Sequence, residues 1–406
     1  MAVDAPRSEG GGAAPLHAAL RFLAGGDVPC RKTVRSYAYV SPPLSLFEGW
    51  FLDAFWGELP QRVYPKWLAP NAITVTGLAC IILAFCIVVF QSPALDGSAG
   101  AKGYAALAVL LFLYQSLDGS DGKQARATKS GSALGEVVDH GVDACTTVLI
   151  PLAVLDLAKL GVSSPANWAC VVLAAAAFYL SNLTLVHTGR QHFQQVDVQE
   201  LLVLLQVACA VAAFEHPRLQ FSADAARFVV VGAVFGMTSN CATLVKELFK
   251  LTADGASNGR GADSAADPGA KSSPDSAGGG RKGLQQQLCG LAAFVAAMAL
   301  NLALARPDVG RPRTFFVPLA VCATCAFGDL SRRLLLQRVA KLPQLLAWRT
   351  PPLLLLASVA FFSGTCTRCC IATFSLVSYA AAAIRTVYAA ADALGIRPFS
   401  IAIKNA

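Results

Sequence analysis

The feature that most constrains this chain is a series of apolar runs that are long enough to cross a lipid bilayer. About 20 predominantly apolar residues in an α-helix span the hydrocarbon core of a membrane, and a helix satisfies every backbone hydrogen bond there. The runs recur along the whole chain, in which 55% of residues are hydrophobic and only 14% are charged. The sequence therefore predicts an all-α polytopic membrane protein whose helices pack in one bundle.

About ten transmembrane helices are expected from these runs. They are residues 68–90, 104–120, 133–158, 166–186, 200–214, 226–245, 285–305, 314–331, 351–363 and 371–392. The ninth run is short for a full crossing, so the range is eight to ten spans, with an even number favoured.

The distribution of basic residues sets the orientation of these spans. Cytosolic loops of membrane proteins carry an excess of Lys and Arg. With ten spans and a cytosolic N-terminus, 25 of the 33 Lys and Arg fall on the cytosolic side. The net charge of +8 follows the same asymmetry, and no nucleic-acid-binding motif accompanies it. The expected partner of this charge is the lipid bilayer and not a nucleic-acid polymer.

The segments outside the spans divide the chain. Residues 44–59 place apolar side chains at three- and four-residue spacing beside two Trp residues, which predicts an amphipathic helix in the membrane interface. Residues 251–283 are rich in Gly, Ser, Ala and Asp, a composition that predicts a disordered cytosolic linker. The remaining segments are a flexible N-terminal arm (1–43), a first group of helices (60–250), C-terminal helices (284–392) and a cytosolic tail (393–406).

Four aspartates interrupt the apolar pattern between the second and third spans. Asp118 and Asp121 are three residues apart at the end of one helix, and Asp139 and Asp143 are four apart near the start of the next. Each pair lies on one helical face, and a short loop makes the two helices antiparallel neighbours. The four carboxylates are therefore expected to converge. Asp in a span costs about 2.5–3.5 kcal/mol at the membrane centre, so several together indicate function and not helix capping.

Converging carboxylates need compensating cations, and oxygen ligands select Mg²⁺ or Mn²⁺ over zinc. A pair of divalent ions would neutralise four carboxylates and would serve phosphoryl transfer, which predicts a phosphate-bearing substrate. Gly122 and Gly135 leave room for a bulky ligand beside the aspartates, and Lys123, Arg126 and Lys129 are placed to hold its phosphates.

The same residues carry a resemblance to a known family. Asp121, Gly122, Ala125, Arg126, Gly135, Asp139 and Asp143 fit, without a gap, the pattern D-G-x2-A-R-x8-G-x3-D-x3-D. The chain thus resembles the CDP-alcohol phosphatidyltransferases. The segments "DGKQAR", "LGEVVDHG" and "WLAPNAIT" resemble more narrowly the eukaryotic choline/ethanolamine phosphotransferase branch. Where members of that branch read "LDAIDG", this chain reads "LDGSDG", a departure that bears on the flexibility of the helix end.

The resemblance implies transfer of phosphocholine and/or phosphoethanolamine from the CDP-alcohol to diacylglycerol, with release of CMP. Residues 60–250 would form the catalytic helices, in an endoplasmic reticulum or Golgi membrane, with the active site facing the cytosol. Asp118, Asp121, Asp139 and Asp143 would hold two Mg²⁺ or Mn²⁺ ions. Gln124 and Ala125 join the expected substrate-binding residues, and Asn71 would either hydrogen-bond the cytidine or cap its helix. A homodimer is possible, and neither the sequence nor the resemblance decides this.

Three residues compete for the role of general base toward the acceptor hydroxyl. Asp143 has that role in the wider family. His140 is the only histidine in the motif, and Glu200 opens the fifth span in a segment that resembles the eukaryotic branch. A structural role through hydrogen bonding or capping is the alternative for His140 and Glu200.

Other functions fit part of the pattern. A phosphatidylinositol or phosphatidylglycerol-phosphate synthase shares the signature, but with about six spans, so the longer chain favours the amino-alcohol branch. An ion-coupled transporter would place its carboxylates near the membrane midplane, whereas these aspartates lie at the cytosolic edge. A catalytically inactive lipid-binding scaffold is disfavoured because every signature position is filled.

Overall fold

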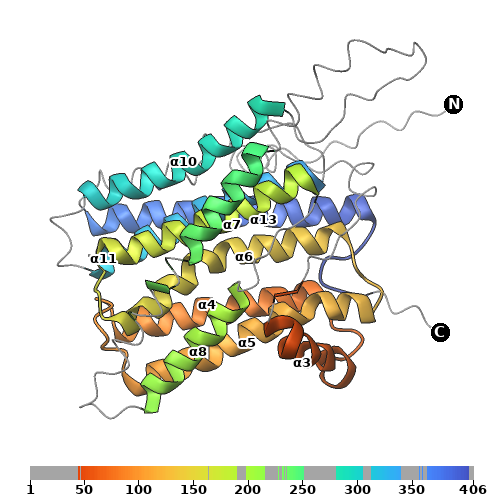
Figure 1. Cartoon of the computed structure of the whole chain (residues 1–406), viewed down its shortest axis with the longest axis horizontal. Coiled ribbons are helices and arrows are strands. Elements are labelled where there is room, and N and C mark those ends of the chain that lie inside the picture. Colours follow the sequence, from red (N-terminus) through yellow and green to blue (C-terminus); the bar gives the residue numbers. More distant parts are fainter. Residues whose placement is uncertain are drawn as a thin grey trace, which may run out of the picture.

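The computed structural model describes residues 44–45, 47–162, 164–189, 198–214, 227, 231–232, 234, 236–250, 280–304, 312–339, 356, 359 and 364–401. All the regular elements in these residues are helices, and the long ones run side by side along the molecule (Figure 1). Seven of them are long and apolar enough to cross a membrane. The prediction of an all-α polytopic membrane protein is confirmed.

The seven long helices are α4 (Pro70–Gln91), α5 (Gly100–Ala127), α6 (Ala133–Val154), α7 (Pro165–Thr188), α10 (Gly280–Leu304), α11 (Pro312–Val339) and α13 (Thr365–Leu394). A short 3-10 helix, Leu155–Ala158, continues α6, and α8 (Val198–Phe214) is a shorter apolar helix of 17 residues. These eight helices match eight of the predicted spans. The sixth predicted span is described as helix over 236–250, and most of the ninth lies outside the described residues.

Proline and glycine set several helix ends. Pro70 and Pro165 occupy the first position of α4 and α7, where a missing N–H costs no hydrogen bond. Gly189 and Gly395 follow α7 and α13 with φ of 72° and 71°, a left-handed conformation that ends a helix and that glycine adopts without strain. The apolar runs of the sequence are thus closed by local residues at these ends.

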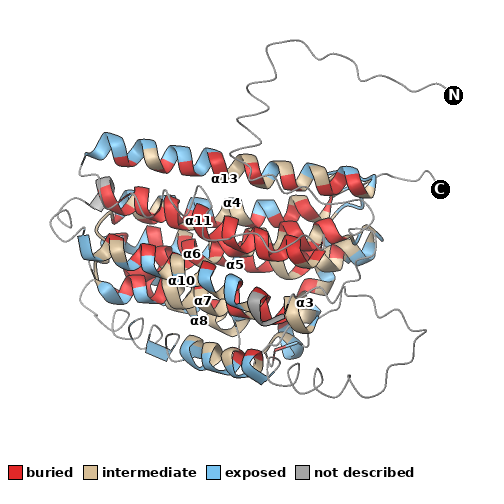
Figure 2. Ribbon diagram, turned by 90° about the horizontal axis from the view of Figure 1, so that it is seen from above, coloured by how far each residue is buried: buried red, intermediate tan, exposed pale blue. Residues whose placement is uncertain are grey.

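Helix α6 lies at the centre of the bundle. It packs against α4, α7, α11 and α13, while α5 packs against α4 and α8. Figure 2 shows that α6 and α11 are mostly buried, whereas α13 exposes an outer face. Residues such as Val148, Leu152 and Leu134 of α6 are fully buried. The position of α6 is therefore fixed from several sides.

A helical segment precedes the first span and lies beside the end of α5 (Figure 1). It consists of a π-helical turn (Glu48–Leu52), α3 (Asp53–Glu58) and a second π-helical turn (Leu59–Val63). Trp56 is buried against the bundle, whereas Trp50 is 79% exposed and Phe51 is 56% exposed. Exposed aromatic side chains on such a helix suit a membrane interface. The helical turns described here run from Glu48 to Val63 and overlap the helix predicted over 44–59, whose place in the membrane interface stays a prediction.

Some predicted segments fall outside the described part of the chain. The N-terminal arm (1–43) and most of the linker (251–279) are among them, as are the last five residues of the tail. Helix α10 begins at Gly280, within the last residues assigned to the linker from the sequence.

Candidate active site

Three of the four predicted aspartates meet between α5 and α6. Asp118, Asp139 and Asp143 each offer a carboxylate oxygen, and these oxygens lie within 4.8 Å of one another. Oδ1 of Asp118 is buried and has no hydrogen-bond partner in the described residues. Carboxylates this close, with few donors, repel one another unless a cation or protons lie among them. Carboxylate oxygens arranged in this way suit a hard cation.

Asp121 lies three residues beyond Asp118, just under one helical turn, and beside this group. It is buried, and its carboxylate accepts a hydrogen bond from the hydroxyl of Thr74 on α4. It is outside the group of three converging oxygens, although its charge acts on Asp139. The structure therefore places Asp121 next to the trio, oriented by a donor from a third helix.

Two hydroxyl groups, those of Tyr114 and Thr146, lie beside Asp143. The hydroxyl of Tyr114 donates to Oδ1 of Asp143 over 3.4 Å and pairs with the hydroxyl of Thr146 at 3.0 Å. Tyr114 precedes Asp118 by four residues and Thr146 follows Asp143 by three, so each shares a helical face with an aspartate. Sequence reasoning missed both residues, although this spacing could have found them.

His140 is buried in the space between α6 and α7. Its Nδ1 lies 2.7 Å from Oδ1 of Asn182, while the amide nitrogen of Asn182 donates to the carbonyl of Phe178. Because the amide oxygen of Asn182 can only accept, Nδ1 of His140 carries the hydrogen, and in the neutral ring Nε2 is then an acceptor. Sequence reasoning also missed Asn182 as a partner of His140, although a polar residue within an apolar span could have indicated it.

Glu200 lies in the first turn of α8, at the docking site of the N-terminal helix. Its Oε1 accepts a hydrogen bond of 2.9 Å from the backbone N–H of Phe47. Nearby, burial raises the pKa of Glu48, with further upward contributions from the charges of Asp53 and Glu200. The Glu200 carboxylate thus anchors the N-terminal helix to α8, and its pairing with His140 stays a prediction.

The three cations of the motif have different surroundings. Lys123 forms an ion pair with Asp53 of α3, which ties it to the N-terminal helix. Arg126 is exposed, and its charge acts on Asp121. Lys129 is exposed in the turn between α5 and α6, with a φ of 54°. Arg126 and Lys129 are thus the two that face solvent.

The small residues of the motif leave space near the aspartates. Gly122, Ala125 and Gly135 are all partly exposed. A Cβ on Gly122 would meet only the Arg126 guanidinium, at 3.7 Å, and a Cβ on Gly135 would meet only Oδ1 of Asn71, at 3.9 Å. This is consistent with the predicted room for a ligand.

Two predicted substrate contacts hold the backbone around the site. The amide nitrogen of Gln124 donates to the carbonyls of Pro65 and Leu68, at 3.1 Å and 3.0 Å. That of Asn71 donates to the carbonyl of Pro398 at 2.7 Å. Gln124 fixes the entry to α4, and Asn71 ties α4 to the C-terminal segment.

The departure "LDGSDG" coincides with the docking site of the N-terminal helix. A Cβ on Gly119 would lie 2.3 Å from the ring of Trp56, so only glycine admits this ring. The hydroxyl of Ser120 pairs with that of Tyr64 at 2.8 Å. The two changed residues thus seat the N-terminal helix against the segment that carries Asp118.

Comparisons with known proteins agree with the motif. Residues 67–238 match the family model for CDP-alcohol phosphatidyltransferase. The chain is 34% identical over 224 residues to Cholinephosphotransferase 1 of Gallus gallus, covering 54% of this chain and 66% of that protein. It is 34% identical over 184 residues to Cholinephosphotransferase 1 of Homo sapiens, covering 45% of this chain and 43% of that protein.

A third relative is an uncharacterized CDP-alcohol phosphatidyltransferase class-I family protein 3 of Dictyostelium discoideum, 32% identical over 179 residues, covering 44% of each chain. The chain therefore spans from about two fifths to just under two thirds of the length of these relatives. The resemblance predicted from the signature is confirmed for residues 67–238, which match the model of that family.

Proposed function

We propose that this protein transfers phosphocholine and/or phosphoethanolamine from a CDP-alcohol to diacylglycerol and releases CMP. The observation that carries the proposal is the convergence of Asp118, Asp139 and Asp143 within 4.8 Å, inside the family signature. The similarity to cholinephosphotransferases supports the amino-alcohol branch over a synthase with an inositol or glycerol-phosphate acceptor. Choline and ethanolamine differ only in N-methylation, and the described residues favour neither.

The aspartates are suited to a divalent metal centre. Asp118, Asp139 and Asp143, with Asp121 beside them, would hold two Mg²⁺ or Mn²⁺ ions, because all the donors are carboxylate oxygens and one oxygen of Asp118 lacks a partner. When bound, such ions stabilise charge on the transferred phosphoryl group and on the leaving CMP.

The remaining residues orient and bind. Thr74 and Tyr114 donate to the carboxylates of Asp121 and Asp143 and thereby fix their directions. Arg126 and Lys129, which are exposed at the same end of the helix pair, would bind the diphosphate. Holding both substrates in line makes a bimolecular step effectively unimolecular. This can lower the activation free energy by about 7–11 kcal/mol at most.

The acceptor hydroxyl must lose its proton as its oxygen attacks. That oxygen forms a bond to the phosphorus that bears the amino-alcohol, and the bond from this phosphorus to the bridging oxygen of CMP breaks. We assign the proton to Nε2 of His140, because Asn182 holds the hydrogen on Nδ1. Asp143 and Glu200 are the rival bases.

The distribution of basic residues supports an active site on the cytosolic face of an endoplasmic reticulum or Golgi membrane. A nucleotide would reach the aspartates from the cytosol, at the end of the bundle where α5 stops and α6 starts. Diacylglycerol, being confined to the bilayer, would enter between helices.

A reconstitution assay tests the proposal. The full chain, purified into lipid nanodiscs that contain diacylglycerol, is expected to release CMP from CDP-choline, CDP-ethanolamine or both, only with added Mg²⁺ or Mn²⁺. CMP release only from CDP-diacylglycerol with inositol or glycerol 3-phosphate would assign the rival synthase activity. Ion-coupled solute flux without CMP release would instead indicate a transporter.

A further inference from the structure

A second group of buried charges lies behind α6, on α11 and outside the matched domain. Nη1 of Arg338 lies 3.1 Å from Oε1 of Glu136, in the first turn of α6, and the two side chains are only 12% and 2% exposed. Glu136 precedes Asp139 by three residues, less than one helical turn. This ion pair thus joins a C-terminal helix to the turn that leads into the aspartates.

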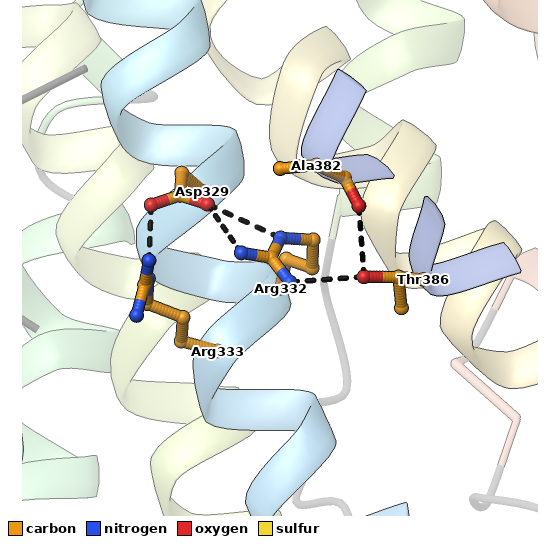
Figure 3. Close-up of polar contacts among 5 residues, drawn as sticks. All are labelled: Asp329, Arg332, Arg333, Ala382 and Thr386. Atoms are coloured by element: carbon orange, nitrogen blue, oxygen red, sulfur yellow. Dashed lines mark hydrogen bonds and ion pairs between the residues drawn. The ribbon is translucent and has the colours of Figure 1, made fainter. Parts of the chain in front are cut away.

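A charged network anchors α11 to its neighbour α13 (Figure 3). Asp329 accepts hydrogen bonds from Arg332 at 2.6 Å and from Arg333 at 2.9 Å. Arg332 also donates to the hydroxyl of Thr386 on α13 at 2.9 Å. All four side chains are buried. Since a lone buried charge is costly, Asp329 compensates the two guanidinium groups within α11, and the bond from Arg332 to Thr386 joins α11 to α13.

Helix α13 in turn contacts α6 just beyond the aspartates. The hydroxyl of Tyr379 lies 3.3 Å from Sγ of Cys145, two residues after Asp143. A Cβ on Gly328 of α11 would lie 2.6 Å from the same hydroxyl, so α11 and α13 approach closely at this point. The part of α6 that carries both aspartates is therefore bracketed, by Arg338 before it and by Tyr379 after it.

We propose that Arg338 and Glu136 are positioning residues for the aspartate cluster. Their ion pair fixes the start of α6, and through it the distance of Asp139 and Asp143 from Asp118 on α5. A buried ion pair adds little net stability, because desolvation offsets the attraction, so geometry is the better explanation for this pair. The inference rests on the proposed function for its catalytic part, and it makes the C-terminal helices a part of the site.

Mn²⁺ binding to the purified full chain, followed by electron paramagnetic resonance, tests the proposal alongside kcat and KM. Arg338→Met and Glu136→Gln are each expected to weaken Mn²⁺ affinity or lower kcat by roughly 10–100-fold, the scale for residues that orient metal ligands. Arg338→Lys keeps the charge and is expected to restore most of the affinity. The double variant Glu136→Gln/Arg338→Met leaves no uncompensated buried charge and serves if a single variant fails to fold.

A matched control lies at the opposite end of α6. Tyr104→Phe removes a buried hydrogen bond to Asp156, so it lowers the unfolding temperature without touching the aspartate cluster. Its Mn²⁺ affinity is expected to equal that of the unaltered protein. Unchanged Mn²⁺ affinity and kcat in Arg338→Met or in the double variant, or an equal loss of affinity in Tyr104→Phe, would overturn the proposal. If the unaltered chain bound Mn²⁺ but released no CMP, the proposed function would fail while the affinity comparison still decided this inference.

Discussion

The two ends of the α6 segment each hold aspartate, fully buried at one end and half-buried at the other, and their surroundings are opposite. At its far end, Asp156 is fully buried and accepts hydrogen bonds from Ser92 at 2.5 Å, the backbone N–H of Gly97 at 2.8 Å and Tyr104 at 3.0 Å. These donors come from the end of α4, the following loop and α5. A carboxylate that is satisfied in this way ties three segments together and needs no further ligand.

At the other end, Asp118, Asp139 and Asp143 face one another instead of donors. Among the described residues, Tyr114 donates to one of them, and an oxygen of Asp118 has no partner. Asp156 is more deeply buried than these three half-buried aspartates, so burial of an acid does not by itself indicate a functional site in this protein. The supply of donors separates a structural aspartate from one that is suited to a cation.

The largest effect on activity is expected from neutralising an aspartate of the cluster, with neutralisation of Asp156 as the comparison. Asp139→Ala and Asp143→Ala are each expected to lower CMP release by about 10³-fold or more, because several kcal/mol of charge stabilisation would be lost with the metal ligand. Asp156→Asn is expected to lower the unfolding temperature but to leave the activity per folded molecule within about threefold, since it lies far from the cluster. Thermal unfolding and CMP release, measured on the same samples, check both.

A chelator provides the control for this comparison. Added to the unaltered chain, EDTA is expected to lower CMP release as much as Asp139→Ala or Asp143→Ala does. It is expected to leave the difference in unfolding temperature between Asp156→Asn and the unaltered chain unchanged. Full turnover in EDTA or in Asp139→Ala would remove the distinction between the two ends. An Asp156→Asn variant that is stable but inactive would also remove this distinction.

The next effect concerns the general base. His140→Ala is expected to lower kcat by roughly 10²–10⁴, with little change in KM for the CDP-alcohol, because the acceptor proton would lose its destination. Asn182→Leu is expected to give a smaller loss, since it removes only the contact that holds the hydrogen on Nδ1. Steady-state kinetics at saturating Mg²⁺ measure both.

Glu200→Ala distinguishes the rival bases. Near-normal turnover in His140→Ala beside an inactive Glu200→Ala would assign the base to Glu200, and near-normal turnover in both would leave Asp143. Loss in both single variants, with a double variant barely worse than either, would indicate that they act as one unit. In this structure Oε1 of Glu200 accepts the backbone N–H of Phe47, so that result would give the carboxylate a second role beside this contact.

Local sequence pattern accounts for what could be predicted. The spans follow from apolar runs, and the approach of Asp118 to Asp139 and Asp143 follows from helical spacing across one short turn. The contacts of Arg338 with Glu136 and of His140 with Asn182 join residues about 200 and 42 positions apart, and no local periodicity reports such pairs. They depend on how the helices pack, which a single sequence does not specify.

The expected substrate contacts teach a related lesson. Asn71 and Gln124 lie at the right place in the motif, yet both amide nitrogens donate to backbone carbonyls. A polar side chain in such a motif can hydrogen-bond either a ligand or a backbone carbonyl. Which of the two it bonds depends on the carbonyls that the tertiary structure brings near it. Spacing alone gave the location of these residues and left their partners open.

A moderate effect is expected where the N-terminal helix meets α5. Gly119→Ala would place a methyl group where the ring of Trp56 lies, so the helix must shift from the segment that carries Asp118. We expect kcat to fall by about tenfold, the consequence of a displacement well below the 1 Å that can cost 10²-fold. Gly57→Ala is the matched control, because a Cβ there meets nothing within 4 Å.

Trp56→Leu in the Gly119→Ala background tests the packing explanation. The smaller side chain would make room for the added methyl group, so the double variant should regain part of the lost activity. No recovery, or an equal loss in Gly57→Ala, would show that the methyl group acts in another way. Purified variants are compared by CMP release per folded molecule.

The smallest effect is expected from the linker, which lies outside the described residues and far from either kind of aspartate in the sequence. Deletion of Asn258 to Ser276 is expected to change kcat by less than a few fold, because a Gly- and Ser-rich tether contributes little beyond its reach and loop-closure entropy changes slowly with length. Replacement of the same residues by a Gly-Ser repeat of equal length controls for reach. CMP release and expression in the membrane fraction measure both variants. If the deletion lost activity while the replacement kept it, the tether would be too short. Loss of activity in both would make the native linker sequence a third region on which the aspartate cluster depends.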